Sequence, residues 1–162
     1  MGYSQTEVDK WQPGEPIPVS FYSEDSKVRG VFYPAVGAGP FSAVILLHGY
    51  PGNDKDVLGL GQKLMKEGIH ALAFNYRGTW GSEGLYTLKN SLRDVRSAIK
   101  YLKSPQMVNK FSMDTTNIVI AGYSFGGGMA LLGSLYDPSV RKVVDIAGAD
   151  MSEMARQVKK DD

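Results

Sequence analysis

The sequence predicts an α/β fold: a doubly wound, mostly parallel sheet that begins with an antiparallel hairpin. Continuously apolar runs of strand length, such as residues 43–47, are typical of parallel strands buried on both faces. Apolar residues recur at helical spacing between these runs, and this alternation indicates βαβ crossovers. The hairpin is predicted from segments 17–22 and 28–33, which the polar turn 23–27 separates.

After the hairpin, strands and helices alternate along the chain. The apolar runs predict strands at 43–47, 69–74, 118–121 and 143–147. Helical spacing or small residues predict helices at 57–65, 88–102 and 125–136. We expect Asn53 or Asp54 to cap the first helix and Thr87 to cap the second, and we expect Pro105 to end the second.

Length and composition indicate one globular domain. The 162 residues are close to one domain at roughly 150 residues per domain, and we divide them into an arm (1–16), a core (17–150) and a polar tail (151–162). The net charge of +1 argues against a nucleic-acid partner, and no apolar run is long enough to span a membrane. Cysteine is absent, which excludes disulfides and cysteine nucleophiles. Together with the lack of a secretory signal, this predicts a cytoplasmic protein.

Residues 122–126 (GYSFG) form a G-x-S-x-G motif between a predicted strand and a helix that begins with small residues. Such a turn reverses the chain in little space and projects the serine at the carboxyl edge of the sheet. We therefore expect Ser124 to be a nucleophile, the alternative being a Gly/Ser-rich turn without chemistry. The motif is not a Walker loop, because Gly128 and Met129 stand where that pattern needs a lysine.

Residues 48–52 (HGYPG) directly follow the first buried strand. Acyl transfer needs two backbone donors aimed at the developing oxyanion. The amides of Phe125 and Tyr50 are the candidates. Phe125 directly follows the serine, and Tyr50 lies in the loop after the neighbouring strand. Tyr50, Tyr123 and Trp80 are the candidate lining of a substrate pocket, which favours a partly apolar acyl or aromatic group.

These two motifs and the loop 75–84 (NYRGTWGSEG) resemble the α/β-hydrolase superfamily over about residues 17–150, in the family's order. The loop is similar to that of serine esterases and dipeptidyl-peptidase-like hydrolases. The resemblance implies a serine hydrolase that cleaves a small carboxylic ester, thioester or amide through an acyl-enzyme at Ser124. It gives Arg77 a structural role in tying loops together near the site. The sequence shows neither a metal-ligand cluster nor a cofactor motif, and we expect no cofactor.

The resemblance also implies the order serine, acid, histidine, and here the sequence departs from it. No histidine follows Ser124. His70 begins a parallel strand, about five residues or ~16 Å from the carboxyl edge, and His48 belongs to the oxyanion loop, where the resemblance gives it an orienting role. Asp150, just after the last strand, is the candidate acid, although most relatives carry the acid one strand later. The general base is therefore expected from outside these residues.

Two interpretations of this departure stay open. We expect the chain to be an N-terminal fragment or half of a split enzyme, because α/β single domains often run to roughly 200–250 residues. A sheet that stops near residue 147 leaves an apolar edge uncovered, so the expected protein partners are a second copy, forming a homodimer, or a complementing C-terminal segment. Alternatively, the chain is a non-catalytic or inactive remnant that binds a small acyl or aromatic ligand or a partner chain. A dehalogenating relative is disfavoured, because it would carry a carboxylate at position 124.

Overall fold

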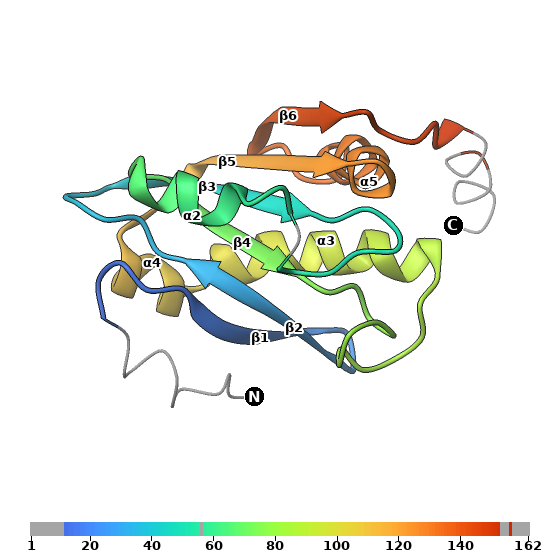
Figure 1. Cartoon of the computed structure of the whole chain (residues 1–162), viewed down its shortest axis with the longest axis horizontal. Coiled ribbons are helices and arrows are strands. Elements are labelled where there is room, and N and C mark those ends of the chain that lie inside the picture. The colour runs from blue at the N-terminus through green and yellow to red at the C-terminus, as the bar shows by residue number, and fades with distance from the viewer. Residues whose placement is uncertain (1–11, 56, 153–155, 157–162) are drawn as a thin grey trace.

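The protein is described by a computed structural model over residues 12–55, 57–152 and 156 (Figure 1). In this part of the chain, six strands form one sheet in the order β1–β2–β4–β3–β5–β6. Their bounds are β1 Ile17–Ser23, β2 Ser26–Tyr33, β3 Phe41–Leu47, β4 His70–Phe74, β5 Met113–Tyr123 and β6 Val140–Ile146. Strands β1, β2 and β4 pair antiparallel, and β4, β3, β5 and β6 pair parallel. The predicted fold class is confirmed.

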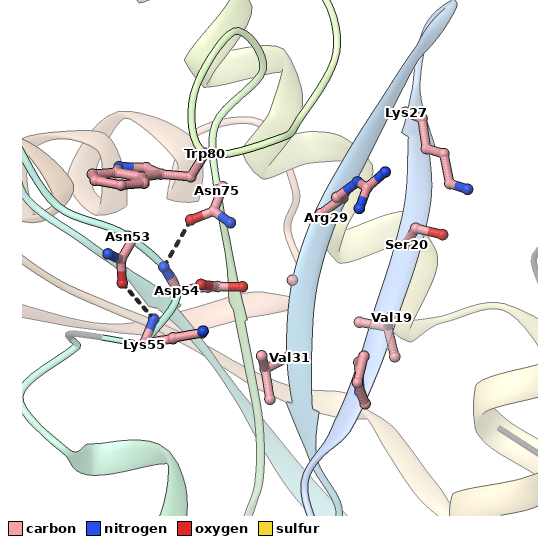
Figure 2. A pocket seen from close by; sticks show the side chains of 12 residues that line it. Val19, Ser20, Lys27, Arg29, Val31, Asn53, Asp54, Lys55, Asn75 and Trp80 are labelled. Carbon is pink, nitrogen blue, oxygen red and sulfur yellow. Dashed lines mark hydrogen bonds between the residues drawn. The ribbon is translucent and has the colours of Figure 1, made fainter. Parts of the chain in front are cut away.

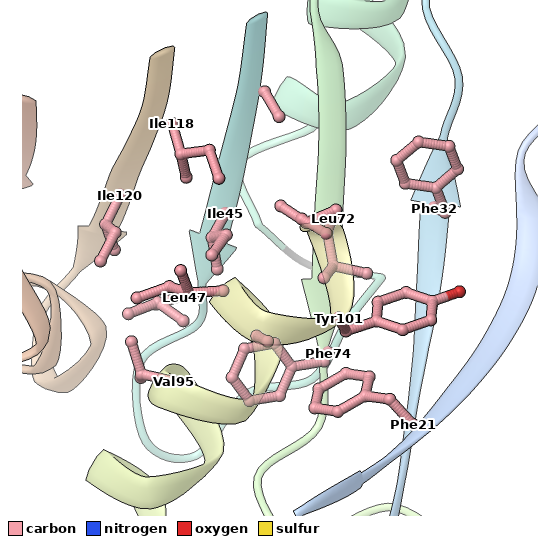
Figure 3. Packing of buried hydrophobic residues seen from close by; sticks show 14 of the residues in the cluster. Phe21, Phe32, Ile45, Leu47, Leu72, Phe74, Val95, Tyr101, Ile118 and Ile120 are labelled. Carbon is pink, nitrogen blue, oxygen red and sulfur yellow. The ribbon is translucent and has the colours of Figure 1, made fainter. Parts of the chain in front are cut away.

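Helices cover both faces of the sheet, as Figure 1 shows. Their bounds are α2 Leu60–Lys66, α3 Leu88–Leu102, α4 Pro105–Phe111 and α5 Phe125–Ser134. Successive side chains of a strand point to opposite faces. Ile45 and Leu47 of β3 therefore join the larger core with α3 and α5 (Figure 3), whereas Val44 and Leu46 pack toward α2 in a smaller cluster. Burial on both faces is the reason the β3 sequence is continuously apolar.

The region before α2 differs from the prediction. The helix begins at Leu60, and its N-cap is Gly59, which has φ 61° and makes no side-chain capping hydrogen bond. Asn53 and Asp54 do not cap it. Asn53 Oδ1 instead accepts from the amide of Lys55 at 2.9 Å, a local turn that competes with helix formation.

The region between α3 and β5 holds a helix that the sequence pattern did not predict. Thr87 caps α3 as expected, with its hydroxyl accepting from the amide of Asn90 at 3.0 Å. Pro105 lies beyond the end of α3 but also starts α4, where Ser104 is the N-cap. Proline suits the first helical position because the amide it lacks would have no intrahelical partner there. The predicted helix 125–136 ends earlier, at Ser134.

The two ends of the chain are only partly described. Of the predicted arm, residues 12–16 hold neither helix nor strand, and residues 1–11 lie outside the described part. Of the predicted tail, only 151, 152 and 156 are described. Across the described residues, the longest apolar helical stretches fall short of what a bilayer crossing requires.

Candidate active site

Ser124 occupies a sharp turn between the end of β5 and the start of α5. Its backbone has φ 54° and ψ −123°, a conformation that is strained for any residue with a Cβ. The surrounding chain holds this geometry: the Ser124 amide donates to the carbonyl of Ile146 at 3.1 Å, and the Ser124 carbonyl accepts from the amide of Ala149 at 2.9 Å. The Ser124 residue is exposed. The turn therefore presents its hydroxyl group to solvent.

The glycines of the GYSFG turn allow its close packing against β3. A Cβ on Gly122 would overlap the carbonyl oxygen of Gly126. A Cβ on Gly126 would overlap the carbonyl of Leu47 and come within 2.6 Å of the carbonyl oxygen of His48. Because these obstacles are backbone atoms, no side-chain rearrangement relieves them. Glycine at both positions is a requirement of the turn, as the motif predicts.

The 48–52 loop lies directly against this turn. A Cβ on Gly49 would come within 3.2 Å of Ser124 Cβ and within 3.0 Å of the Tyr123 ring. Parallel pairing of Leu47 with Gly122 brings the ends of β3 and β5 to the same edge of the sheet. Within the described chain, neither the Tyr50 amide nor the Phe125 amide has a hydrogen-bond acceptor. Two unpaired donors thus flank the serine, on the loop and on the helix that follow adjacent strands.

Four aromatic rings line up beside this edge. Tyr50 stacks on Tyr86 with centroids 5.1 Å apart and planes at 16°, and Phe125 lies 6.0 Å from Tyr86. Phe125 also meets Tyr76 edge to face at 5.5 Å. Burial, followed by the nearby Tyr50, raises the pKa of Tyr86 to about 12, so this phenol stays neutral at physiological pH. Tyr86 was missed in the sequence analysis, and its spacing along the chain carries no signal of this long-range stacking.

The predicted pocket residues do not all come together. Tyr50 belongs to the aromatic group, and Tyr123 packs on the 49–52 segment, with its hydroxyl 3.3 Å from the place of a Cβ on Gly52. Trp80 instead lines a separate groove beside β2, to which residues 48–52 and 122–126 contribute nothing (Figure 2).

Arg77 ties three parts of the fold together below this edge. Its Nε donates to Asp94 of α3 at 2.7 Å, and its two terminal nitrogens donate to Glu24 at 2.9 Å and Ser23 at 2.7 Å in the hairpin turn. Asp94 is fully buried and also accepts from the Arg77 amide at 2.8 Å. The Arg77 hydrogen bond lowers the pKa of Glu24. This network fixes the loop 75–86 on the sheet, which is the structural role expected for Arg77.

Neither histidine is placed to deprotonate Ser124. His48 is buried, its Nδ1 lies 2.7 Å from the Gly49 carbonyl, and its Nε2 has no partner among the described residues. Burial lowers the pKa of His48 and favours the neutral ring. His70 pairs with Ala43 at the amino edge of the sheet, opposite the Ser124 turn.

The carboxylate expected as the acid lies after β6. Asp150 is exposed, and its Oδ1 accepts from the Ser152 amide at 2.8 Å. That hydrogen bond lowers the pKa of Asp150 and keeps it ionised. No ring nitrogen of the two histidines bonds to it within the described chain. Among the described residues, no cluster of potential metal ligands occurs either.

Two curated proteins are similar to this chain in sequence. The quorum-quenching protein AidA of Acinetobacter baumannii is 30% identical over 137 residues, which cover 82% of this chain and 43% of AidA. The uncharacterized protein YfhR of Salmonella typhi is 31% identical over 123 residues, 74% of this chain and 40% of YfhR. The chain thus spans less than half the length of these curated relatives.

Among solved structures, the esterase Pf2001 of Pyrococcus furiosus superposes with a TM-score of 0.71 at 25% identity. The superposition covers 93% of this chain and 58% of the esterase. The family model described as BD-FAE matches residues 30–159, which include both motif loops. By this match and by its fold, the chain belongs to the BD-FAE family of α/β-hydrolase-like proteins.

Proposed function

We propose that Ser124 is the nucleophile of a serine hydrolase that cleaves a carboxylic ester, thioester or amide. The observation that carries this proposal is the strained, exposed serine against a loop with an unpaired amide. Ser124 Oγ attacks the carbonyl carbon and gives its proton to a base. The amides of Tyr50 and Phe125 stabilise the oxyanion of the tetrahedral intermediate. The leaving group departs with that proton, and water then hydrolyses the acyl-enzyme at the same carbon.

The base must come from a histidine that these residues do not contain. His48 is buried against Gly49, and His70 lies at the other edge of the sheet. The exposed apolar side chains at the β6 edge, Val144 and Ile146, favour a complementing C-terminal segment as the partner that covers this edge and supplies the histidine. Asp150 is exposed at this edge, and we assign it as the acid that would orient such a histidine.

The aromatic group beside the turn favours a substrate with an apolar or aromatic acyl part. Tyr50 is exposed by 62% and its ring is held by stacking on Tyr86, so it offers a flat surface at little cost in side-chain entropy.

A fluorophosphonate probe tests this mechanism in a preparation that contains the complementing segment proposed above. We expect covalent labelling that disappears in Ser124→Ala. The matched control is Ser112→Gly, because Ser112 is also exposed with positive φ but precedes β5 at the opposite edge. Labelling that persists in Ser124→Ala, or that is absent in the unsubstituted protein, would rule out Ser124 as the nucleophile.

A second candidate function is binding without turnover, favoured by the placement of both histidines away from Ser124. Turnover of a short-chain nitrophenyl ester by this chain together with the complementing segment separates hydrolysis from binding without turnover. Turnover abolished by Ser124→Ala supports the enzyme. The alternative is supported if the ester binds but shows no Ser124-dependent turnover. This result must hold both for this chain alone and for the complemented preparation.

A further inference from the structure

A groove of about 620 Å³ lies between the β1–β2 hairpin and the loop around Asn53 (Figure 2). Its floor is the outer face of β2, and Asn75 and Trp80 form the wall nearest the carboxyl edge of β4. No residue of the Ser124 turn or of the 48–52 loop lines it. The groove is therefore separate from the proposed active site.

Two hydrogen-bond donors converge in this groove. Arg29 is exposed on β2, and within the described chain its guanidinium has neither a hydrogen-bond partner nor an ion-pair partner. Asn75 is only 3% exposed, and its Oδ1 is occupied by the Asp54 amide at 2.8 Å. Figure 2 shows the amide nitrogen of Asn75 directed toward Arg29. This nitrogen donates to none of the described groups, so a ligand in the groove can accept from both side chains.

Hydrogen bonds join the backbone segments that carry these two donors. The Asn75 amide donates to the Arg29 carbonyl at 2.9 Å. The Arg29 amide donates to Ser82 Oγ at 2.9 Å, and Ser82 Oγ donates to the Asn75 carbonyl at 2.8 Å. Ser82 is itself buried. These bonds set the spacing of the two backbone segments that carry the donors, whereas the exposed Arg29 side chain still loses conformational freedom when a ligand binds.

Trp80 adds a flat apolar surface to the groove wall, on the other side of Asn75 from Arg29 (Figure 2). Its indole is exposed by 63%, and its backbone has φ 43°, which is unusual for a residue with a large side chain. Strain of this kind persists only where the surrounding structure imposes it. The loop 75–86 that carries Trp80 is anchored by the buried Arg77–Asp94 pair. The backbone that carries the exposed indole is consequently held by the fold.

We propose that this groove binds a small anionic ligand, whose phosphate or carboxylate group is held by Arg29 and Asn75 and whose flat apolar part lies on Trp80. A guanidinium matches the geometry of both anions through paired hydrogen bonds. Lys27 and Lys55 line the same groove and add positive charge. The Asp54 carboxylate also lines the groove, below Asn75 in Figure 2, and its negative charge opposes an anion there.

Phenyl phosphate is the probe, because it combines an anion with an aromatic ring, and phenol and inorganic phosphate separate the two contributions. We expect binding to shift the NMR signals of the Trp80 indole and the Asn75 side-chain amide. We expect Arg29→Gln to weaken binding at least tenfold. Asp54→Asn should tighten it, because it removes a like charge. The matched control is Arg141→Gln, since Arg141 is exposed on β6 at the far edge of the sheet.

Benzoate tests whether a carboxylate serves as well as a phosphate, and either anion supports the proposal when Arg29→Gln weakens its binding. Unshifted signals of Trp80 and Asn75 would overturn it, as would equal affinity in Arg29→Gln and the unsubstituted protein. Ser124→Ala should bind phenyl phosphate unchanged. Binding lost in Ser124→Ala but kept in Arg29→Gln would move the ligand to the proposed active site and overturn the groove assignment.

Discussion

Replacing Ser124 by glycine should stabilise the protein while removing its chemistry. The φ of 54° and ψ of −123° at Ser124 are strained for a residue with a Cβ, which costs about 1–3 kcal/mol. Glycine relieves this strain but loses about 0.4–1 kcal/mol through the greater freedom of the unfolded chain. Alanine keeps the Cβ and therefore keeps the strain. We expect Ser124→Gly to be about 1 kcal/mol more stable than Ser124→Ala, the difference between these two contributions.

Urea unfolding of the two variants measures this difference. For a chain of this size, 1 kcal/mol corresponds to a shift of about 2–4 °C in Tm, which thermal unfolding also resolves. Ser20→Gly is the control, because Ser20 lies within β1, and glycine there should destabilise by about 0.5–1 kcal/mol. Equal stability of Ser124→Gly and Ser124→Ala would refute the argument that the turn stores strain.

Three further substitutions test the rest of the fold. Asp94→Ala leaves the Arg77 guanidinium buried without its main partner, so the free energy of unfolding measured in urea should fall by about 3 kcal/mol. The control is Arg93→Ala, which breaks only an exposed ion pair and should lower the free energy of unfolding by less than about 1 kcal/mol. Thr87→Ala removes the α3 cap and should cost about 1 kcal/mol, with Thr87→Ser restoring most of it. Burial lowers the pKa of His70 in the folded state, so the unfolded state takes up the proton first and stability should fall as pH drops below about 6.5. His70→Gln should flatten that slope between about pH 8 and pH 5.5 in urea titrations, and an unchanged slope would exclude the His70 contribution.

Local patterns predicted the sheet well because each buried strand shows its burial directly in its sequence. β3 and β4 are apolar on both faces and were recognised as runs without alternation. The Gly residues of the two motif loops were informative for a similar reason, because a Cβ on Gly52, Gly122 or Gly126 would overlap a backbone atom close by. Gly126, which faces the carbonyl of Leu47, is the strongest case.

Contacts between distant segments could not be predicted in this way. The stacking of Tyr50 on Tyr86 and the ion pair of Arg77 with Glu24 depend on how loops fold over the finished sheet. α4 was missed for a different reason, because Pro105 is compatible with both the end of one helix and the first turn of another. Only the geometry after Ser104 distinguishes the two.

The strand order explains how most of the site that we propose is brought together. Because β3 and β5 are neighbours, the loop after one and the turn after the other meet at one sheet edge. The nucleophile and both oxyanion donors that we propose thus come from the segments that follow two adjacent strands. In the proposed mechanism the base approaches from the β6 side, where Asp150 lies exposed. In the proposed mechanism, this chain therefore stabilises the oxyanion, whereas proton transfer depends on a segment that docks at the edge of its sheet.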